Sequence, residues 1–273
     1  YYTSDYSTKE ETLSAANAFN EKIVEEGIVL LKNEDALPIP TPESDQSVSR
    51  KPKLSVFGHN SINLVYGGPG SAGGDGSEGA STIYDSLQAA GYEYNPVLKS
   101  FYESSAAGEV RDTPTMGDNT LAGVRIGETP IGNYTDAVRQ SYSEYSDAAV
   151  VVLSRFGGEG FDLPRTMKTS LTDSGEKVEG ARSAEDHYLQ LDENEVNMLR
   201  EVMEHFDNII IVINSSQTIE LGFLDDPSHY LYTDGNWATP DQAQRQMDKI
   251  KGALWIGSPG KSGINALGRV MNG

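Results

Sequence analysis

Short apolar runs alternate along the chain with stretches in which apolar residues recur at helical spacing. The clearest runs are segment 148–153, which reads Ala-Ala-Val-Val-Val-Leu, and segment 208–213, which is almost pure Ile and Val after its first residue. Similar runs occupy residues 28–31, 54–58 and 253–256. Runs of this length, rich in β-branched residues, predict strands that are buried on both faces of a sheet.

Two of the predicted helices begin with capping boxes. The first runs from Ser7, its N-cap, to about Glu26, and Glu10 is the partner of Ser7. The second begins at Asp192, with Glu195 three residues further on. A polar N-cap followed three residues later by Glu is typical of a helix start. Each predicted helix carries one apolar face, formed by Leu13, Ala16, Phe19 and Ile23 in the first and by Val196, Leu199, Val202, Met203 and Phe206 in the second.

Further helices are predicted over residues 81–90, 135–145 and 241–249, and a further strand over 92–98. Apolar strands that alternate with amphipathic helices predict an α/β fold with a mainly parallel sheet. We therefore expect a three-layer α/β sandwich, in which about six strands are covered by helices on both faces. In such sheets the functional groups gather at the carboxyl ends of the strands.

The chain reads as one elaborated domain over residues 1–273. It shows no internal repeat and no clear linker. Three segments lack a regular pattern and are predicted to be irregular insertions, at about 38–52, 105–132 and 165–190.

Composition and charge exclude several classes of function. The formal net charge is −20, from 41 acidic and 21 basic residues. A field of that sign repels phosphate backbones and anionic lipids, so we expect neither nucleic acid nor membrane as a partner. Cysteine is absent, which removes disulfides and thiolate chemistry. We expect no signal peptide in this chain, and the sequence leaves a bacterial cytoplasmic or secreted location open.

The strongest candidate for chemistry is Glu159, in the segment 154–162 directly after the Val-rich strand. Glycines flank it on both sides, so its carboxylate is carried on an uncrowded loop. Such a group could act as a general acid or base in a cleft, or be a surface residue of a turn. Glycosidic cleavage normally needs two carboxyl groups. Asp162 is the nearest possible partner, although its position favours a role in holding the loop.

A Gly-rich loop over residues 67–74 follows the strand at 54–58. It invites comparison with nucleotide-binding loops, but it has neither the tight GxGxxG placement nor the GK[ST] ending. A loop that bends close to a polar ligand fits better, with Ser71 as a hydrogen-bond donor. The four histidines lack metal-ligand spacing, so we expect no metal and no other cofactor.

Several segments, taken together and in order, resemble glycoside hydrolase family 3. The matching segments are 26–33 (Glu-Gly-Ile-Val-Leu-Leu-Lys-Asn) with 36–39, 54–58 with the loop 67–71, 157–162 (Gly-Gly-Glu-Gly-Phe-Asp), and 253–263 with 265–268. The residues around Glu159 and segment 221–225 look most like the branch of that family in which the sandwich domain precedes the barrel.

The resemblance implies a six-stranded α/β sandwich that packs beside a (β/α)₈ barrel, with the active site between them. In the family's pattern Glu159 matches the acid/base, and Ser71 a serine that touches the sugar. Phe161 and Asp162 match residues of the same loop and are carried over as substrate-binding positions. The family often has a basic residue after the Asp, where this chain has Leu163.

The barrel, which the chain is too short to contain, would carry the nucleophilic Asp and would belong to the same polypeptide or to a companion chain. The implied function is part of a retaining exo-β-glycosidase, with a β-glucosidase that takes β-glucosides or cello-oligosaccharides and needs no cofactor as the first choice. The isolated chain would be inactive. The alternatives are a non-catalytic carbohydrate-binding or scaffolding module, a β-xylosidase or other β-glycosidase specificity, and a nucleotide-dependent enzyme on a Rossmann-like sheet.

Overall fold

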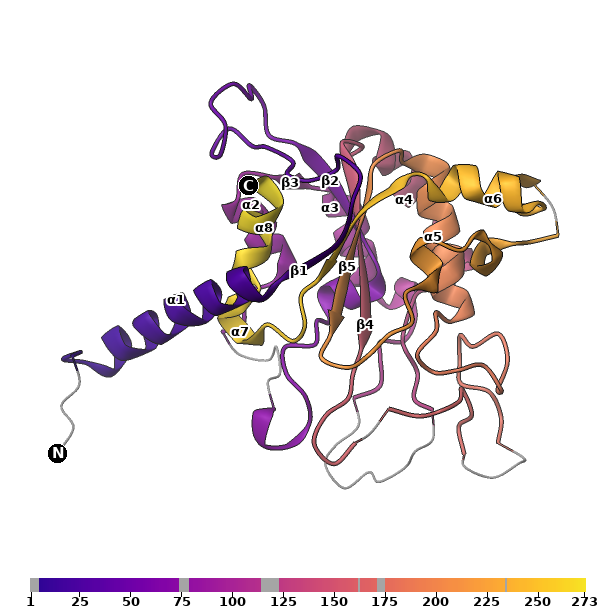
Figure 1. Ribbon diagram of the computed structural model, residues 1–273, viewed down its shortest axis with the longest axis horizontal. Helices are drawn as coiled ribbons and strands as arrows, with labels where there is room; N and C mark the ends of the chain where they lie inside the picture. Colours follow the sequence, from indigo (N-terminus) through magenta and orange to yellow (C-terminus); the bar gives the residue numbers. More distant parts are fainter. Residues whose placement is uncertain (1–4, 74–78, 114–122, 162, 171–174, 234) are drawn as a thin grey trace.

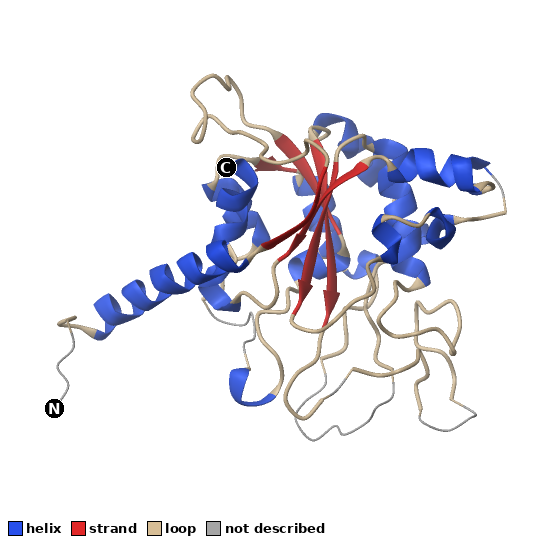
Figure 2. Cartoon of the chain, in the orientation of Figure 1, coloured by secondary structure: helices blue, strands red, loops and turns tan. Residues whose placement is uncertain are grey.

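The protein is built around one six-stranded sheet (Figure 1; Figure 2). The computed structural model describes residues 5–73, 79–113, 123–161, 163–170, 175–233 and 235–273. The strand order is β1-β6-β5-β4-β2-β3. The strands are β1 (Val29–Asn33), β2 (Lys53–Phe57), β3 (Glu93–Tyr94), β4 (Ala148–Arg155), β5 (Ile209–Ser215) and β6 (Ile250–Trp255).

Five strands run parallel, and β1 alone of the six pairs antiparallel, with β6, at one edge of the sheet. Every residue of β4 and β5 is buried. This matches their unbroken apolar sequences, because a strand covered on both faces has no solvent side that would need polar residues. The expected mainly parallel, six-stranded α/β sandwich is confirmed.

Helices cover both faces of the sheet (Figure 2). Side chains alternate along each strand, so Val151 and Ile211 join the core under one layer of helices while Val150 and Ile210 join the core under the other. The first layer contains α3, α4, α5 and α6, and the second contains α2 and α8. The helices are α1 (Lys9–Gly27), α2 (Ile83–Ala89), α3 (Pro96–Tyr102), α4 (Asp136–Ser141), α5 (Glu193–His205), α6 (Pro240–Met247), α7 (Gly260–Gly263) and α8 (Asn265–Asn272).

Helix α1 differs from the other helices because it projects from the body of the molecule (Figure 1). Its second half lies against α7 and α8, where the Asn20 amide donates to the Pro259 carbonyl at 3.2 Å. No residue of α1 is buried, and the Phe19 side chain is 66% exposed. The helix was predicted correctly, and its apolar residues Leu13, Phe19 and Ile23 are exposed.

The cap of α1 is shifted by one residue from the predicted frame. Thr8, and not Ser7, is the N-cap, and its hydroxyl accepts from the N–H of Glu11 at 3.1 Å. Glu11 in turn accepts from the N–H of Thr8 at 3.2 Å. Two hydroxyl residues and two glutamates are adjacent here, so the sequence allows both frames and the reciprocal pair forms one residue later.

The segment 92–98 is strand only at Glu93 and Tyr94 and becomes helix at Pro96, which corrects the predicted strand in part. Only Glu93 and Tyr94 pair with β2. The Asn95 side chain then accepts from the N–H groups of Val97 and Leu98, each at 3.1 Å, and Pro96 occupies the first helical turn. A side-chain cap followed by proline starts a helix, and this local signal outweighs the apolar run.

The described residues of the predicted irregular segments form short 3₁₀ turns but no named strand or α-helix. In the part of the chain that the structure describes, no helix is both long and apolar enough to cross a bilayer.

Candidate active site

The carboxyl ends of β2, β4, β5 and β6 lie along one edge of the sheet, because these strands are parallel. The loops that follow them converge there and enclose a pocket of about 460 Å³. Helix α1 closes one side of it. The lining residues are Asn20, Ile23, Val24, Tyr66, Gly67, Gly68, Pro69, Gly157, Gly158, Glu159, Ser216, Ser258, Pro259 and Gly260.

Glu159 and Ser71, which are 88 residues apart in the sequence, meet at this pocket. The carboxylate of Glu159 accepts a hydrogen bond from the backbone N–H of Ser71 at 2.8 Å. The backbone N–H and then the hydroxyl of Ser71 hold the pKa of Glu159 below its ordinary value. A hydrogen bond to the charged form favours ionisation, so this glutamate is a solvent-exposed carboxylate at neutral pH.

Glycines allow the two loops to approach each other. A Cβ at Gly70, whose φ is +82°, would lie 2.6 Å from the Glu159 Oε2 atom. A Cβ at Gly158 would lie 2.8 Å from the Pro69 Cδ atom. Both distances are shorter than van der Waals contact. The glycines of this loop therefore allow the backbone N–H of Ser71 to reach the carboxylate of the neighbouring loop.

The other two predicted site residues differ in position. Phe161 is buried, and its backbone exchanges two hydrogen bonds with Gly158, at 3.0 and 3.1 Å. It closes the turn that carries Glu159 and does not line the pocket. Asp162 lies outside the described residues. Among the described residues that line the pocket, Glu159 is the one carboxylate.

Arg155 anchors the start of the Glu159 loop, and the sequence analysis missed it. Its guanidinium is fully buried and pairs with Glu195 at 2.7 and 2.8 Å. It also donates to the carbonyls of Ser154, Tyr188 and Gln190. Burial works against its charge, but the charge and hydrogen bonds of Glu195 outweigh that effect and raise the pKa of Arg155. An arginine that ends an otherwise apolar strand was the available signal.

A buried acid, Glu128, lies near the end of β2 but does not line the pocket. Its carboxyl oxygens accept from the N–H of His59, at 3.1 and 3.2 Å, and from the N–H of Thr129 at 2.8 Å. Burial raises the pKa of Glu128 to about 8. At neutral pH this group therefore keeps its proton, in contrast to Glu159.

The described residues contain no group of three or more His, Cys, Asp or Glu side chains that could hold a metal ion. The chemistry that this edge offers is that of one exposed carboxylate in an open, glycine-rich pocket. Such a carboxylate can exchange a proton with a ligand, but the second carboxyl group of a glycosidase has to come from outside the lining residues.

Comparison with known proteins agrees with this architecture. The family model for the glycosyl hydrolase family 3 C-terminal domain matches residues 28–273. A β-glucosidase A of Butyrivibrio fibrisolvens is 26% identical over 204 residues, which cover 71% of this chain and 22% of that protein. A β-glucosidase of Ruminococcus albus is 26% identical over 214 residues, which cover 77% of this chain and 19% of that protein.

A solved β-glucosidase structure from Paenibacillus barengoltzii has a similar fold. It superposes with a TM-score of 0.60 and 22% identity, over 94% of this chain and 23% of that one. The chain thus spans about a fifth of the length of the curated relatives that it matches.

Proposed function

Because the chain belongs to glycoside hydrolase family 3 and has the fold of its C-terminal domain, we propose that it supplies the general acid/base of a retaining exo-β-glycosidase, with Glu159 in that role. The observation that carries the proposal is the Glu159 carboxylate, held by Ser71 at the mouth of a pocket on the carboxyl edge of the sheet. The favoured substrate is a β-glucoside. A β-xyloside remains the alternative, because the sugar would be chosen largely by residues of the barrel.

A (β/α)₈ barrel would complete the site by supplying an Asp nucleophile. Two features of this chain support a covering domain. The pocket is open and has one carboxylate among its described lining residues, whereas retaining glycosidases need two, about 5 to 5.5 Å apart. Helix α1 also presents Ile23, which is exposed, at the rim of the same pocket. We expect the chain without a barrel to be inactive.

In the proposed reaction Glu159, protonated, donates to the glycosidic oxygen while the barrel Asp attacks the anomeric carbon. The leaving alcohol departs with the proton, and a covalent glycosyl-enzyme forms. Glu159, now ionised, takes a proton from water, and the water oxygen displaces the Asp to release the sugar with its configuration retained. The barrel and the neighbouring charge of its Asp would raise the pKa of Glu159 from its low value in this chain.

The test is hydrolysis of aryl β-glucosides by the complete enzyme that contains this chain, with the Glu159→Ala substitution. Removal of a general acid lowers turnover by roughly 10² to 10⁴, most for poor leaving groups. Azide should restore turnover on activated substrates and release a β-glycosyl azide, because a small anion can enter the space left by the carboxylate.

The matched control is Glu109→Ala, which removes an exposed glutamate that does not line the pocket and should leave turnover unchanged. If Glu159→Ala keeps near wild-type activity, Glu159 is a loop residue and the proposal fails. A chain that binds cello-oligosaccharide in the Glu159 pocket but is never part of an active enzyme would favour the non-catalytic module.

A further inference from the structure

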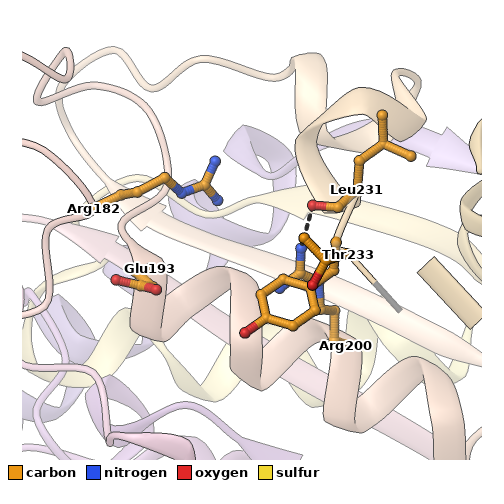
Figure 3. Close-up of a pocket in the computed structure, with 6 residues that line it drawn as sticks. Arg182, Glu193, Arg200, Leu231 and Thr233 are labelled. Carbon is orange, nitrogen blue, oxygen red and sulfur yellow. Dashed lines mark hydrogen bonds between the residues drawn. The ribbon is translucent and has the colours of Figure 1, made fainter. Parts of the chain in front are cut away.

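A second pocket lies on the α5 side of the molecule, between α5 and the segment that follows the 3₁₀ turn Pro227–Tyr230 (Figure 3). Its volume is about 340 Å³, within the range of small-ligand sites. It shares no lining residue with the Glu159 pocket. The residues that line it are Arg182, Glu193, Arg200, Leu231, Tyr232 and Thr233.

We propose that this pocket is a second sugar-binding site, which holds one neutral pyranose unit of an oligosaccharide through the Tyr232 ring and the Arg182 and Glu193 side chains. The choice of a gluco-configured sugar rests on the proposed function. The site itself rests on the three features that follow.

The first feature is an aromatic ring that is exposed but fixed. The Tyr232 side chain is 56% exposed, and the Arg200 guanidinium carbon lies 4.8 Å from the ring centroid. The backbone N–H of Tyr232 donates to the Trp237 carbonyl at 2.9 Å, which holds the residue in place. Aromatic faces carry negative charge density, so they attract the weakly positive C–H groups of a pyranose. A ring that is already immobilised loses little entropy when a sugar stacks on it.

The second feature is the way in which Arg200 is held. Its guanidinium donates to the carbonyl of Tyr230 at 2.6 and 3.0 Å, to the carbonyl of Leu231 at 2.9 Å and to the Asn197 side chain at 3.0 Å. Figure 3 shows Arg200 beneath the pocket, bonded to Leu231. With most of its donors committed to the protein, Arg200 supports the ring and has little capacity left to bind an anion.

The third feature is a pair of uncommitted opposite charges. Arg182 and Glu193 both line the pocket and are exposed, and neither side chain has a hydrogen bond or ion pair with the described residues. A sugar hydroxyl is both donor and acceptor, so neighbouring hydroxyls can accept from the guanidinium and donate to the carboxylate. A carboxylated or phosphorylated ligand could pair with Arg182 but offers Glu193 no donor, whereas the hydroxyls of a neutral sugar satisfy both groups.

The experiment is a titration of the 273-residue chain with cellotetraose, followed by calorimetry and by tryptophan fluorescence in a Trp255→Phe background, which leaves Trp237 as the reporter, 5.8 Å from the Arg200 guanidinium. Tyr232→Ala should weaken binding by about tenfold or more, because the stacking surface is lost. Tyr232→Phe keeps the ring and should bind like the wild type. Arg182→Ala, a change on the surface that does not endanger folding, should also weaken binding.

The matched control is Tyr6→Ala, which removes a 48% exposed tyrosine just before α1, a helix on the other side of the sheet from α5 in Figure 1. Glu159→Ala is the second control, and it separates this proposal from the proposed function. Binding that survives Glu159→Ala and Tyr6→Ala but is lost in Tyr232→Ala and Arg182→Ala supports the second site.

Three results would overturn the proposal: no binding by the wild-type chain, equal binding by the wild type and by folded Tyr232→Ala and Arg182→Ala variants, or tighter binding of trigalacturonate than of cellotetraose. Binding that is lost only in Glu159→Ala takes place in the Glu159 pocket, and that result also contradicts a second site. Loss of azide rescue in the complete enzyme would refute the proposed role of Glu159 and leave these binding results unaffected.

Discussion

Glu128 and Glu159 have the same side chain, but their positions in the fold shift the two pKa values in opposite directions. Glu128 is buried, and the loss of water raises its pKa to about 8 even though backbone N–H groups of His59 and Thr129 donate to it. Glu159 is exposed, and its bonds from Ser71 act in the opposite direction. Desolvation thus dominates at one glutamate and hydrogen bonding at the other.

Glu128 should make the stability of the chain depend on pH. The unfolded chain ionises this group near its ordinary pKa of 4.5, whereas the folded chain keeps the proton to about pH 8. Between these values the unfolded state binds fewer protons, so the free energy of unfolding falls as pH rises, by at most about 1.4 kcal/mol per pH unit. In Glu128→Gln this contribution disappears, and the variant should gain on the wild type from pH 5 to pH 8.

Urea unfolding at several pH values in that window measures the effect, with Glu109→Gln on the surface as the control. The comparison concerns the change with pH, since the amide also alters the hydrogen bonds from His59 and Thr129 by a constant amount. Parallel curves for Glu128→Gln and the wild type would show that Glu128 is ionised in the folded chain at neutral pH.

At the scale of the elements, Arg155 holds together β4, α5 and the long connection between them. It ends β4, pairs with Glu195 of α5, and donates to Tyr188 and Gln190 in the long connection between these elements. Glu195 also accepts from the N–H of Asp192 at 2.9 Å as part of the α5 capping box. The same ion pair thus fixes the start of the Glu159 loop and the beginning of a helix.

Arg155→Met should destabilise the chain by about 3 to 5 kcal/mol, because it leaves the buried Glu195 carboxylate without its cation. Arg155→Lys keeps the charge but loses the bidentate geometry, and should lie between Met and wild type. The control is Arg50→Met, which breaks the ion pair with Asp147 at the surface and should cost far less stability than Arg155→Met. Chemical unfolding gives all three values, and equal losses for Arg155→Met and Arg50→Met would be contrary to this account.

The sequence predicts those elements whose burial is complete or whose caps are local. The strands β4 and β5 were placed from unbroken apolar runs, and α5 from Asp192 and Glu195, because these signals lie within a few residues of each other. The segment 92–98 was predicted as one strand, but the strand ends at Tyr94 because the Asn95 side chain caps α3 directly after it. Such boundaries are decided by which local hydrogen bonds can form.

The candidate site could be predicted only in part, for a similar reason. The glycines beside Glu159 mark a carboxylate on an open loop, and this signal is local. The contact from Ser71 joins loops 88 residues apart, and nothing in either loop alone reveals it. Arg155 was missed because its partners come from three separate segments, and a pattern read along the chain does not show which of them meet.

At the scale of the whole molecule, the carboxyl end of the sheet is covered by loops and not by a layer of helices (Figure 2). The Glu159 pocket opens at this end, and α1 extends beside it with Leu13, Phe19 and Ile23 exposed. A row of exposed apolar side chains next to a pocket is typical of a surface that meets another domain. The family's barrel is the partner that the proposed function assigns to it.

The proposed partnership predicts two different pKa values for Glu159. In the chain by itself the carboxylate should titrate below 4.5, because Ser71 donates to it and no barrel removes its water. In the complete enzyme a barrel wall and a nearby Asp would disfavour the charged form, so the alkaline limb of kcat/KM should fall well above that value. NMR of the Glu159 carboxyl carbon in the chain and a pH–rate profile of the enzyme compare the two states.

Ser71→Ala is the matched variant for this comparison, since it removes the hydroxyl donor and keeps the backbone N–H. The pKa of Glu159 in the isolated chain should rise, but only in part, because the backbone bond is the larger of the two causes. A Glu159 that titrates at the same pH in the chain and in the enzyme would mean that the barrel does not change its surroundings. The acid step would then need another proton donor, since a carboxyl group ionised at working pH has no proton to give to the glycosidic oxygen.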